Sequence, residues 1–322
     1  MEPRRAVRSL RSVHAARVTR AARAVLCLAI CAALGAGAAV AALPTAVDPA
    51  YQASVEKWRH DYETTLRADD GWLTVSGLFW LHTGENRFGS DPLGDIVVPG
   101  KSVPAQIGAF TFHDGKVVVH AQPGAKLLLN GKPVTTAELH ADMPTERLEL
   151  GDLAFFVHAS GTRFGIRLKD KNSKARREFS GLHWFPIDPA YRVTARFVPY
   201  QPPKTEQTQN IVGDFDPYVM IGTVTFTLQG KQYQLEGSEN MPGTGTLFIV
   251  FRDLTSGKLT DSAARFLVTA APKDGAVVLD FNEAYNPPCA YTAYATCPLP
   301  SSGNRLRLAI PAGEKNYKEQ GD

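Results

Sequence analysis

Short stretches in which apolar and polar residues alternate recur along most of the chain from residue 108 onward. A period of two places successive side chains on opposite faces of a β-strand. Gly, Asn, Asp or Pro, which favour turns, bound most of the stretches. Examples are KVVVHA, RLELGDLAFFVHA, YRVTARFVPY, GTVTFTLQGKQYQLEG and GAVVLDFN. The pattern predicts an all-β, mainly antiparallel fold with two β-domains, each a sandwich or a barrel.

One segment, residues 48–69, has a helical period instead. Asp48 is a good N-cap, and Pro49 suits the first helical position. Apolar residues then recur at steps of three or four: Tyr51, Val55, Trp58, Tyr62 and Leu66. This stripe predicts one N-terminal amphipathic helix that packs on a sheet.

Residues 1–41 have the pattern of an export signal. An Arg-rich start leads into the apolar run AVLCLAICAAL and then to Ala39-Val40-Ala41, which is typical of a cleavage site. The apolar run is shorter than the ~20 residues that a membrane anchor needs. We therefore expect an extracytoplasmic protein, periplasmic or secreted, with no stable membrane span after cleavage.

Removing this segment changes the charge balance. The whole chain has 35 basic and 32 acidic residues, and residues 1–41 hold seven Arg and one Glu, which leaves 28 and 31. The mature chain thus has a net charge of about −3, so a nucleic-acid partner has no electrostatic support. A charged stretch at 169–181 favours a domain boundary. The predicted organisation is signal 1–41, helix 42–71, first β-domain 72–170 and C-terminal β-domain 171–322.

The segment DFNEAYNPPCAYTAYATCPLP, residues 280–300, holds both cysteines of the mature chain, Cys289 and Cys297. In an oxidising compartment such an isolated pair on a Pro-rich loop predicts a disulfide. The bridge would hold Tyr291 and Tyr294 in place to stack on a sugar or an apolar ligand. Alternatively, the loop closes an open end of a barrel and the tyrosines belong to its core.

Polar side chains gather at the start of this segment. Asp280 and Asn282 share one strand face, and Tyr285 and Asn286 follow. They could bind a polar ligand or a hard cation through oxygens, or they could cap the turn. We predict no metal site and no cofactor. The predicted ligand-binding residues are Asp280, Asn282, Tyr285, Asn286, Tyr291, Tyr294, Arg265 and Asn304.

The usual catalytic motifs are absent, and no histidine follows residue 183. A Ser-His or Cys-His pair within the last 139 residues alone is therefore excluded. Asp253, Asp280 and Glu314 are candidates for an acid and a base of a hydrolase. They would need to converge within about 5 to 10 Å. Whether the chain is an enzyme stays open on these grounds.

Several long blocks resemble domain-of-unknown-function family 1684, including WFPIDPAYRVTARFVPY and DFNEAYNPPCAYTAYATCPLPSSGNRLRLAIPAGEKNY. The resemblance covers nearly all of the mature chain and implies no activity. In KLTDSAARFL the chain departs from the expected pattern, with Asp261, Ala263 and Ala264 where an aromatic residue and glycines are usual.

The first domain is similar in layout to forkhead-associated domains, which are small β-sandwiches that bind phosphothreonine. The resemblance is carried by GENRFG, DIVV, Asn130-Gly131 and Leu150-Gly151-Asp152, in that order. Ser90 stands where that family has an Arg after the glycine, and VPAQIG replaces its Ser-x-x-His stretch. The resemblance implies a shared architecture without the phosphopeptide site.

Three functions follow as hypotheses. The first is an exported binding or structural module with a disulfide-shaped polar pocket in the C-terminal domain, whose ligand is a small polar molecule, a sugar or a peptide. The second is a carboxylate-dependent hydrolase of envelope or extracellular polar polymers. The third is a protein-interaction domain, which an exposed apolar patch on the first domain would favour.

Overall fold

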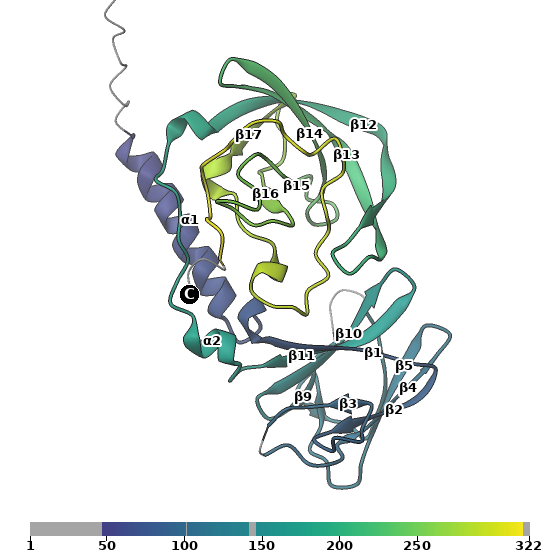
Figure 1. The fold of residues 1–322 in the computed structure, drawn as a ribbon. Coiled ribbons are helices and arrows are strands. Elements are labelled where there is room, and N and C mark those ends of the chain that lie inside the picture. The colour runs from purple at the N-terminus through teal and green to yellow at the C-terminus, as the bar shows by residue number, and fades with distance from the viewer. Residues whose placement is uncertain (1–46, 101, 142–145, 318–322) are drawn as a thin grey trace, which may run out of the picture. The chain divides into compact units, whose positions relative to one another are not determined.

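Three β-sheets make up most of the protein (Figure 1). The structure is a computed structural model that describes residues 47–100, 102–141 and 146–317, so the predicted signal lies outside the described residues. Within this part of the chain every strand pair is antiparallel except β2 with β3. The fold is all-β and mainly antiparallel, as the alternating pattern predicts.

Two sheets are built from residues 75–170 and enclose a core that includes Phe88, Phe110 and Phe155. The first sheet has the order β1 (Val75–Trp80), β11 (Arg163–Asp170), β10 (Leu153–Ser160), β9 (Leu148–Leu150), β6 (Leu128–Leu129) and β7 (Lys132–Pro133). The second has the order β3 (Ile96–Val97), β2 (Gly84–Gly89), β4 (Gly108–His113), β5 (Lys116–Ala121) and β8 (Thr136–Leu139).

The third sheet is built from residues 192–280. Its order is β16 (Arg265–Val268), β15 (Leu247–Phe251), β14 (Lys231–Glu239), β13 (Phe215–Leu228), β12 (Arg192–Gln209) and β17 (Ala276–Asp280). The C-terminal segment covers one face of this sheet, because Leu306, Leu308 and Ile310 pack into its core. In the sequence, the short helix α2 (Lys174–Glu178) follows the first two sheets and precedes the third. The two-domain division near residues 169–181 stays a prediction.

The N-terminal helix α1 (Pro49–Arg67) forms as predicted. The Asp48 side chain caps it by accepting a hydrogen bond from the backbone N–H of Ala50, and Pro49 begins it. Its apolar stripe buries Val55 and Leu66 completely. The helix also bonds to the segment after β17: the Tyr51 hydroxyl donates to Asp280, and Arg59 donates to the carbonyl of Asn282. The predicted loop of residues 280–300 therefore lies against α1.

Candidate functional site

A pocket of about 410 Å³ lies where the end of α1 meets the third sheet and the 280–300 segment. This volume is in the range of small-molecule sites. Aromatic rings from five different segments of the chain form much of its wall, so we name it the aromatic pocket. Its lining residues are Tyr62, Thr65, Leu66, Asp70, Gly71, Trp72, Phe248, Phe266, Tyr285 and Pro288.

The rings of the aromatic pocket are held by contacts with one another. The Tyr62 and Tyr285 ring centres lie 4.9 Å apart, and those of Phe248 and Phe266 lie 4.8 Å apart in a T-shaped arrangement. The backbones of Phe266 and Tyr285 exchange two hydrogen bonds, of 2.9 and 3.0 Å. Burial raises the pKa of Tyr285 to about 12, so its hydroxyl is neutral at physiological pH. The wall is therefore preformed and uncharged on this side.

Gly71 makes the turn that brings Trp72 to the pocket. A Cβ atom at this position would lie 2.3 Å from the carbonyl oxygen of Leu66 and 2.5 Å from that of Thr65. Only glycine permits so close an approach of two backbone segments. The 3-10 helix Trp72–Thr74 follows at once and leads into β1. The turn thus fixes the Trp72 ring relative to the end of α1.

The predicted polar residues at the end of β17 face α1 instead of a pocket. Asp280 accepts hydrogen bonds from the Tyr51 hydroxyl at 2.8 and 3.0 Å and from the backbone N–H of Asn282 at 3.1 Å. The Asn282 side chain is fully buried. Its oxygen accepts a hydrogen bond from the backbone N–H of Asp188, and its amide nitrogen donates to the backbone carbonyl of the same residue. This arrangement corresponds to the turn-capping alternative, extended by the contacts that hold the helix.

Glu314 and Asn286 form a second buried cluster, with Tyr291. The backbone N–H and the side-chain amide of Asn286 donate to the two oxygens of Glu314 at 2.8 and 2.7 Å. The Tyr291 hydroxyl lies 2.7 and 2.8 Å from the same oxygens and 3.2 Å from the Tyr62 hydroxyl. Burial, the largest cause, raises the pKa of Glu314 to about 8. The cluster connects the C-terminal segment, the 280–300 segment and α1.

Arg265 and Asp253 form a buried ion pair. The Nη1 atom lies 2.6 Å from Asp253 and 2.9 Å from the carbonyl oxygen of Ile310, and Nη2 donates to the carbonyl of Ala312. Asp253 also accepts two hydrogen bonds from Thr255. Asn304 makes a similar clamp, since its amide bonds to the backbones of Glu236 and Val250. These predicted ligand residues hold strands and the C-terminal segment together.

The three candidate catalytic carboxylates are each engaged with other groups of the protein. Asp253 pairs with Arg265, Asp280 with Tyr51 and Asn282, and Glu314 with Asn286 and Tyr291. None of the three lines the aromatic pocket. These three residues therefore provide no pair of accessible carboxylates. The geometry does not support the hypothesis of a carboxylate-dependent hydrolase.

Cys289 and Cys297 are thiols in the structure. They lie side by side, because the backbone N–H of Cys289 is 3.2 Å from the sulfur of Cys297. Contact with the Cys289 thiol, together with burial, raises the pKa of Cys297, so its thiolate is disfavoured. The disulfide stays a prediction. Tyr291 of the same loop is buried with Leu66 and Leu182, whereas Tyr294 is 41% exposed.

Of the predicted ligand residues, Tyr285 alone lines the aromatic pocket. Tyr62, Trp72, Phe248 and Phe266 were not predicted as site residues. Tyr62 belongs to the helical stripe and Phe248 and Phe266 to alternating strands, so each looks like an ordinary core position in the sequence. The one available signal was the cluster of aromatic residues at the end of α1, where the stripe continues into Trp72.

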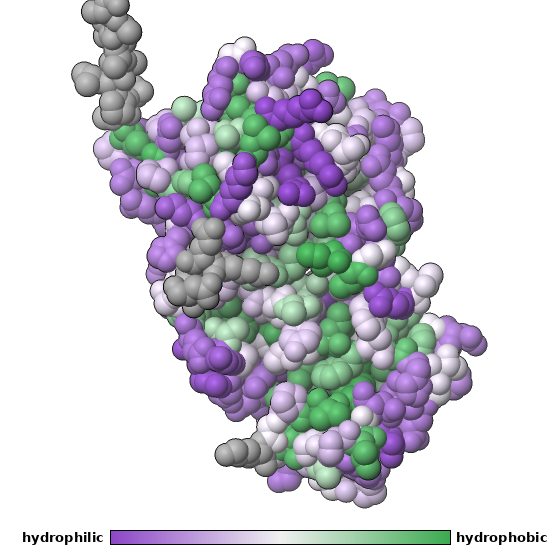
Figure 2. All heavy atoms as spheres, in the orientation of Figure 1, coloured by the Kyte–Doolittle hydropathy of each residue, from purple (hydrophilic) through white to green (hydrophobic). Residues whose placement is uncertain are grey.

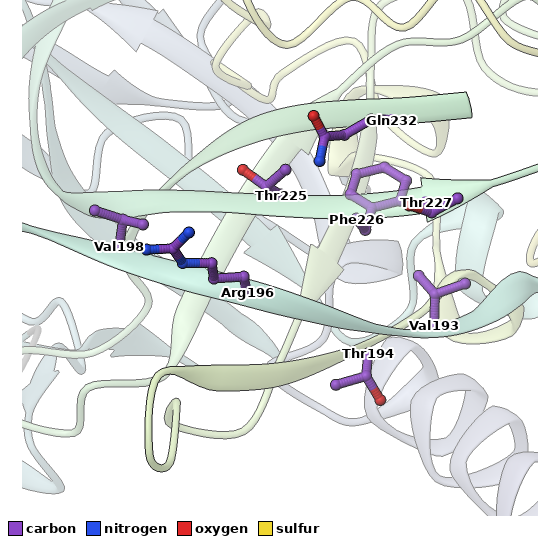
Figure 3. Close-up of a pocket in the computed structure, with 8 residues that line it drawn as sticks. All are labelled: Val193, Thr194, Arg196, Val198, Thr225, Phe226, Thr227 and Gln232. Atoms are coloured by element: carbon purple, nitrogen blue, oxygen red, sulfur yellow. The ribbon is translucent and has the colours of Figure 1, made fainter. Parts of the chain in front are cut away.

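A second pocket, of about 620 Å³, lies on strands β12, β13 and β14 (Figure 3). It is lined by Arg196, Thr225 and Gln232 from these strands, with Val193, Thr194, Val198, Phe226 and Thr227. Phe226 is its only aromatic residue, and no residue predicted from the sequence lines it. We regard the aromatic pocket as the stronger candidate, because its rings enclose a ligand-sized space.

No group of three or more His, Cys, Asp or Glu side chains in the described part of the chain could hold a metal ion. No described helix is both long and apolar enough to cross a membrane.

Residues 177–315 match the family described as "Protein of unknown function (DUF1684)". The chain belongs to this family, as the sequence blocks from residue 184 onward indicate, whereas the predicted resemblance before residue 177 lies outside the match. A similar solved structure is the uncharacterized protein from gene locus rrnAC0354 of Haloarcula marismortui. It shares 34% identity with this chain, and the alignment covers 44% of this chain and 78% of that one, with a TM-score of 0.38. No curated protein matches the chain.

Forkhead-associated (FHA) domains are also among the structural neighbours. One was solved in a study of phosphothreonine-dependent FHA domain interactions. It has 14% identity and a TM-score of 0.22, over 29% of this chain and 92% of that one. The FHA domain of Rv0020c has 14% identity and a TM-score of 0.21, over 28% and 76%.

Proposed function

We propose that this protein is an exported binding module whose aromatic pocket holds a small ligand with an apolar or ring-bearing group. The observation that carries the proposal is the set of aromatic side chains around a space of about 410 Å³. Aromatic walls bury large areas of ligand and stack on planar groups. A sugar ring or an aromatic ring fits such a wall better than the small polar ligand that the sequence favours.

The position of the pocket in the fold supports binding rather than a purely structural role. Its rings come from α1, the turn at Trp72, β15, β16 and the segment after β17, and the contacts described above hold them in place. A rigid wall binds with little loss of side-chain entropy. The alternative of a protein-interaction domain has less support, because the large apolar side chains exposed in the first β-domain, among the described residues, are Leu93 and Val97 alone. On the face shown in Figure 2, hydrophobic residues (green) gather in a band through the middle and lower part, with hydrophilic ones (purple) mainly on either side.

Filling the pocket tests the proposal. Thr65 lines it, and its neighbour Thr64 does not. Both threonines are exposed on α1 and both donate to the carbonyl four residues earlier, at 3.0 and 2.9 Å. We expect the neutral fluorescent probe N-phenyl-1-naphthylamine to bind saturably to the protein. Thr65→Phe should weaken this binding about tenfold or more, because the new ring occupies the pocket. Thr64→Phe is the matched control and should leave binding unchanged.

Absence of saturable probe binding would contradict the proposal. So would an equal effect of the two Phe substitutions, because the probe would then bind elsewhere. Native mass spectrometry of the purified protein offers a probe-free check, since a ligand that copurifies with the unaltered protein should be lost from Thr65→Phe.

Export is the second part of the proposal. We expect the mature protein to begin near Ala42 and to be found in an extracytoplasmic fraction, because Ala39-Val40-Ala41 ends a short apolar run. N-terminal sequencing of the fractionated protein measures this. A full-length chain that is extracted only with the membrane would contradict it.

A further inference from the structure

Three basic side chains gather beside the aromatic pocket, on the first sheet. Arg167 and Lys169 lie two residues apart on β11, so they point from the same face, and Arg147 lies just before β9. The ammonium of Lys169 lies 5.1 Å from the centre of the Phe156 ring, and the guanidinium of Arg147 lies 5.7 Å from it. The guanidinium of Arg167 lies 5.4 Å from the centre of the Trp72 ring. We name these three residues the cationic cluster.

The cationic cluster has few anionic partners. Arg147 pairs with Glu149 at 2.7 Å, and Lys169 donates to the backbone carbonyl of Asp70. The Arg167 side chain forms no ion pair or hydrogen bond with any residue that the structure describes, and its Nε is buried. Burying even part of a guanidinium without a carboxylate partner is costly to the fold. Such a cost is typical of a binding site, where a ligand offsets it.

Electrostatic effects within the cluster point the same way. Burial lowers the pKa of Arg167 to about 10. Burial also lowers the pKa of Lys169, and the nearby charges of Arg147 and Arg167 lower it further, with Asp70 acting in the opposite sense. Burial is thus the main cause at both groups, and at Lys169 the charges of Arg147 and Arg167 add to it. An added anion would be attracted to this place.

The cationic cluster borders the aromatic pocket through two residues of the pocket wall. Trp72 lines the pocket, and the guanidinium of Arg167 lies over its ring. Asp70 also lines the pocket, and its carbonyl oxygen accepts the hydrogen bond from Lys169. Positive charge thus lies at one edge of a wall that is otherwise aromatic.

We propose that the ligand of the aromatic pocket is a small organic anion, with its apolar or ring-bearing part against Tyr62, Trp72 and Tyr285 and its anionic group on Arg167 and Lys169. This rests on the proposed binding function of the same pocket. A carboxylate, sulfonate or phosphate suits the two donors, because a guanidinium can bind two oxygens at once and an ammonium adds a third contact.

Two probes that differ by a single sulfonate test the proposal. The compound 8-anilinonaphthalene-1-sulfonate is N-phenyl-1-naphthylamine with one ring hydrogen replaced by a sulfonate group. We expect the sulfonate to bind the unaltered protein more tightly than the neutral probe. Arg167→Gln should weaken sulfonate binding about tenfold, the size expected for one charge-assisted hydrogen bond, and should change neutral-probe binding less than about twofold. Arg196→Gln, in the second pocket of Figure 3, is the control and should change neither.

Each of the other outcomes contradicts either the proposed binding function or the proposed preference for an anion. If neither probe binds, the proposed binding function fails, and this proposal fails with it. If both probes bind with equal affinity, or Arg167→Gln weakens both alike, the anion preference fails while the binding function stands. Thermal unfolding checks that Arg167→Gln is folded. If that variant does not fold, Lys169→Gln takes its place and should weaken the sulfonate severalfold and spare the neutral probe.

Discussion

Arg265→Met is expected to lower the free energy of unfolding by about 3–5 kcal/mol, the usual range for removing one partner of a buried ion pair. Both side chains of the pair are inaccessible, at 1% and 0% exposure for Arg265 and Asp253. The substitution leaves the Asp253 carboxylate buried without its cation, although Thr255 still donates to it. It also frees the carbonyls of Ile310 and Ala312, to which Arg265 donates. Urea denaturation monitored by circular dichroism measures the change.

The double variant Arg265→Met, Asp253→Asn separates the ion pair from the backbone clamp. Removing the second charge should recover part of the lost stability, because no uncompensated carboxylate then stays buried. What is not recovered reports the contacts with Ile310 and Ala312. A loss below about 1 kcal/mol in the single variant would contradict the structural role of Arg265.

Glu314→Gln is expected to remove a dependence of stability on pH that extends from about 4.5 to about 8. In the folded protein burial raises the pKa of Glu314 from 4.5 to about 8. Between these values the folded state binds a proton that the unfolded state has released, so stability falls as the pH rises. The full shift corresponds to at most about 5 kcal/mol. The measurement is the free energy of unfolding at several pH values for both proteins.

Other groups also titrate in this window, among them His82, whose pKa is raised from 6.5 by a hydrogen bond to the backbone carbonyl of the next residue and by Asp95. The difference between the two proteins therefore carries the test. The pKa of Glu283 is raised to about 7, mainly by burial, and this gives a slope of the same sign. The pKa of His158 is lowered to about 4 by burial, which makes stability rise with pH between about 4 and 6.5. The comparison is therefore clearest from pH 6.5 to 8. Parallel curves for the two proteins there would contradict the buried, protonated state of Glu314.

The sequence predicts the fold better than it predicts the site. Asp48 and Pro49 identify the start of α1, and the period of two identifies the strands, because both signals are local. The same period places Asp280 and Asn282 on one face of a strand. It does not say what covers that face. In the structure α1 covers it, and the polar side chains that look free to bind a ligand instead bind Tyr51 and Asp188.

The aromatic pocket could not be predicted because its wall is assembled from distant segments. Tyr62 and Trp72 precede Tyr285 by more than 200 residues, and Phe248 and Phe266 come from alternating strands whose inward faces are normally core. Arg167 likewise looks like any polar residue on the outer face of a strand. Only the tertiary arrangement leaves it without a carboxylate.

The hydrogen bonds between α1 and the segment after β17 also affect how the chain is made. Tyr51 and Asp280 are 229 positions apart, and Tyr62 and Tyr291 are separated by the same number. A ribosome releases α1 long before the residues that it must contact. During that interval the part of the apolar stripe that packs on Ala290 and Tyr291 is not yet covered by them. Nascent chains should therefore depend on holding chaperones until their last tenth has been synthesised.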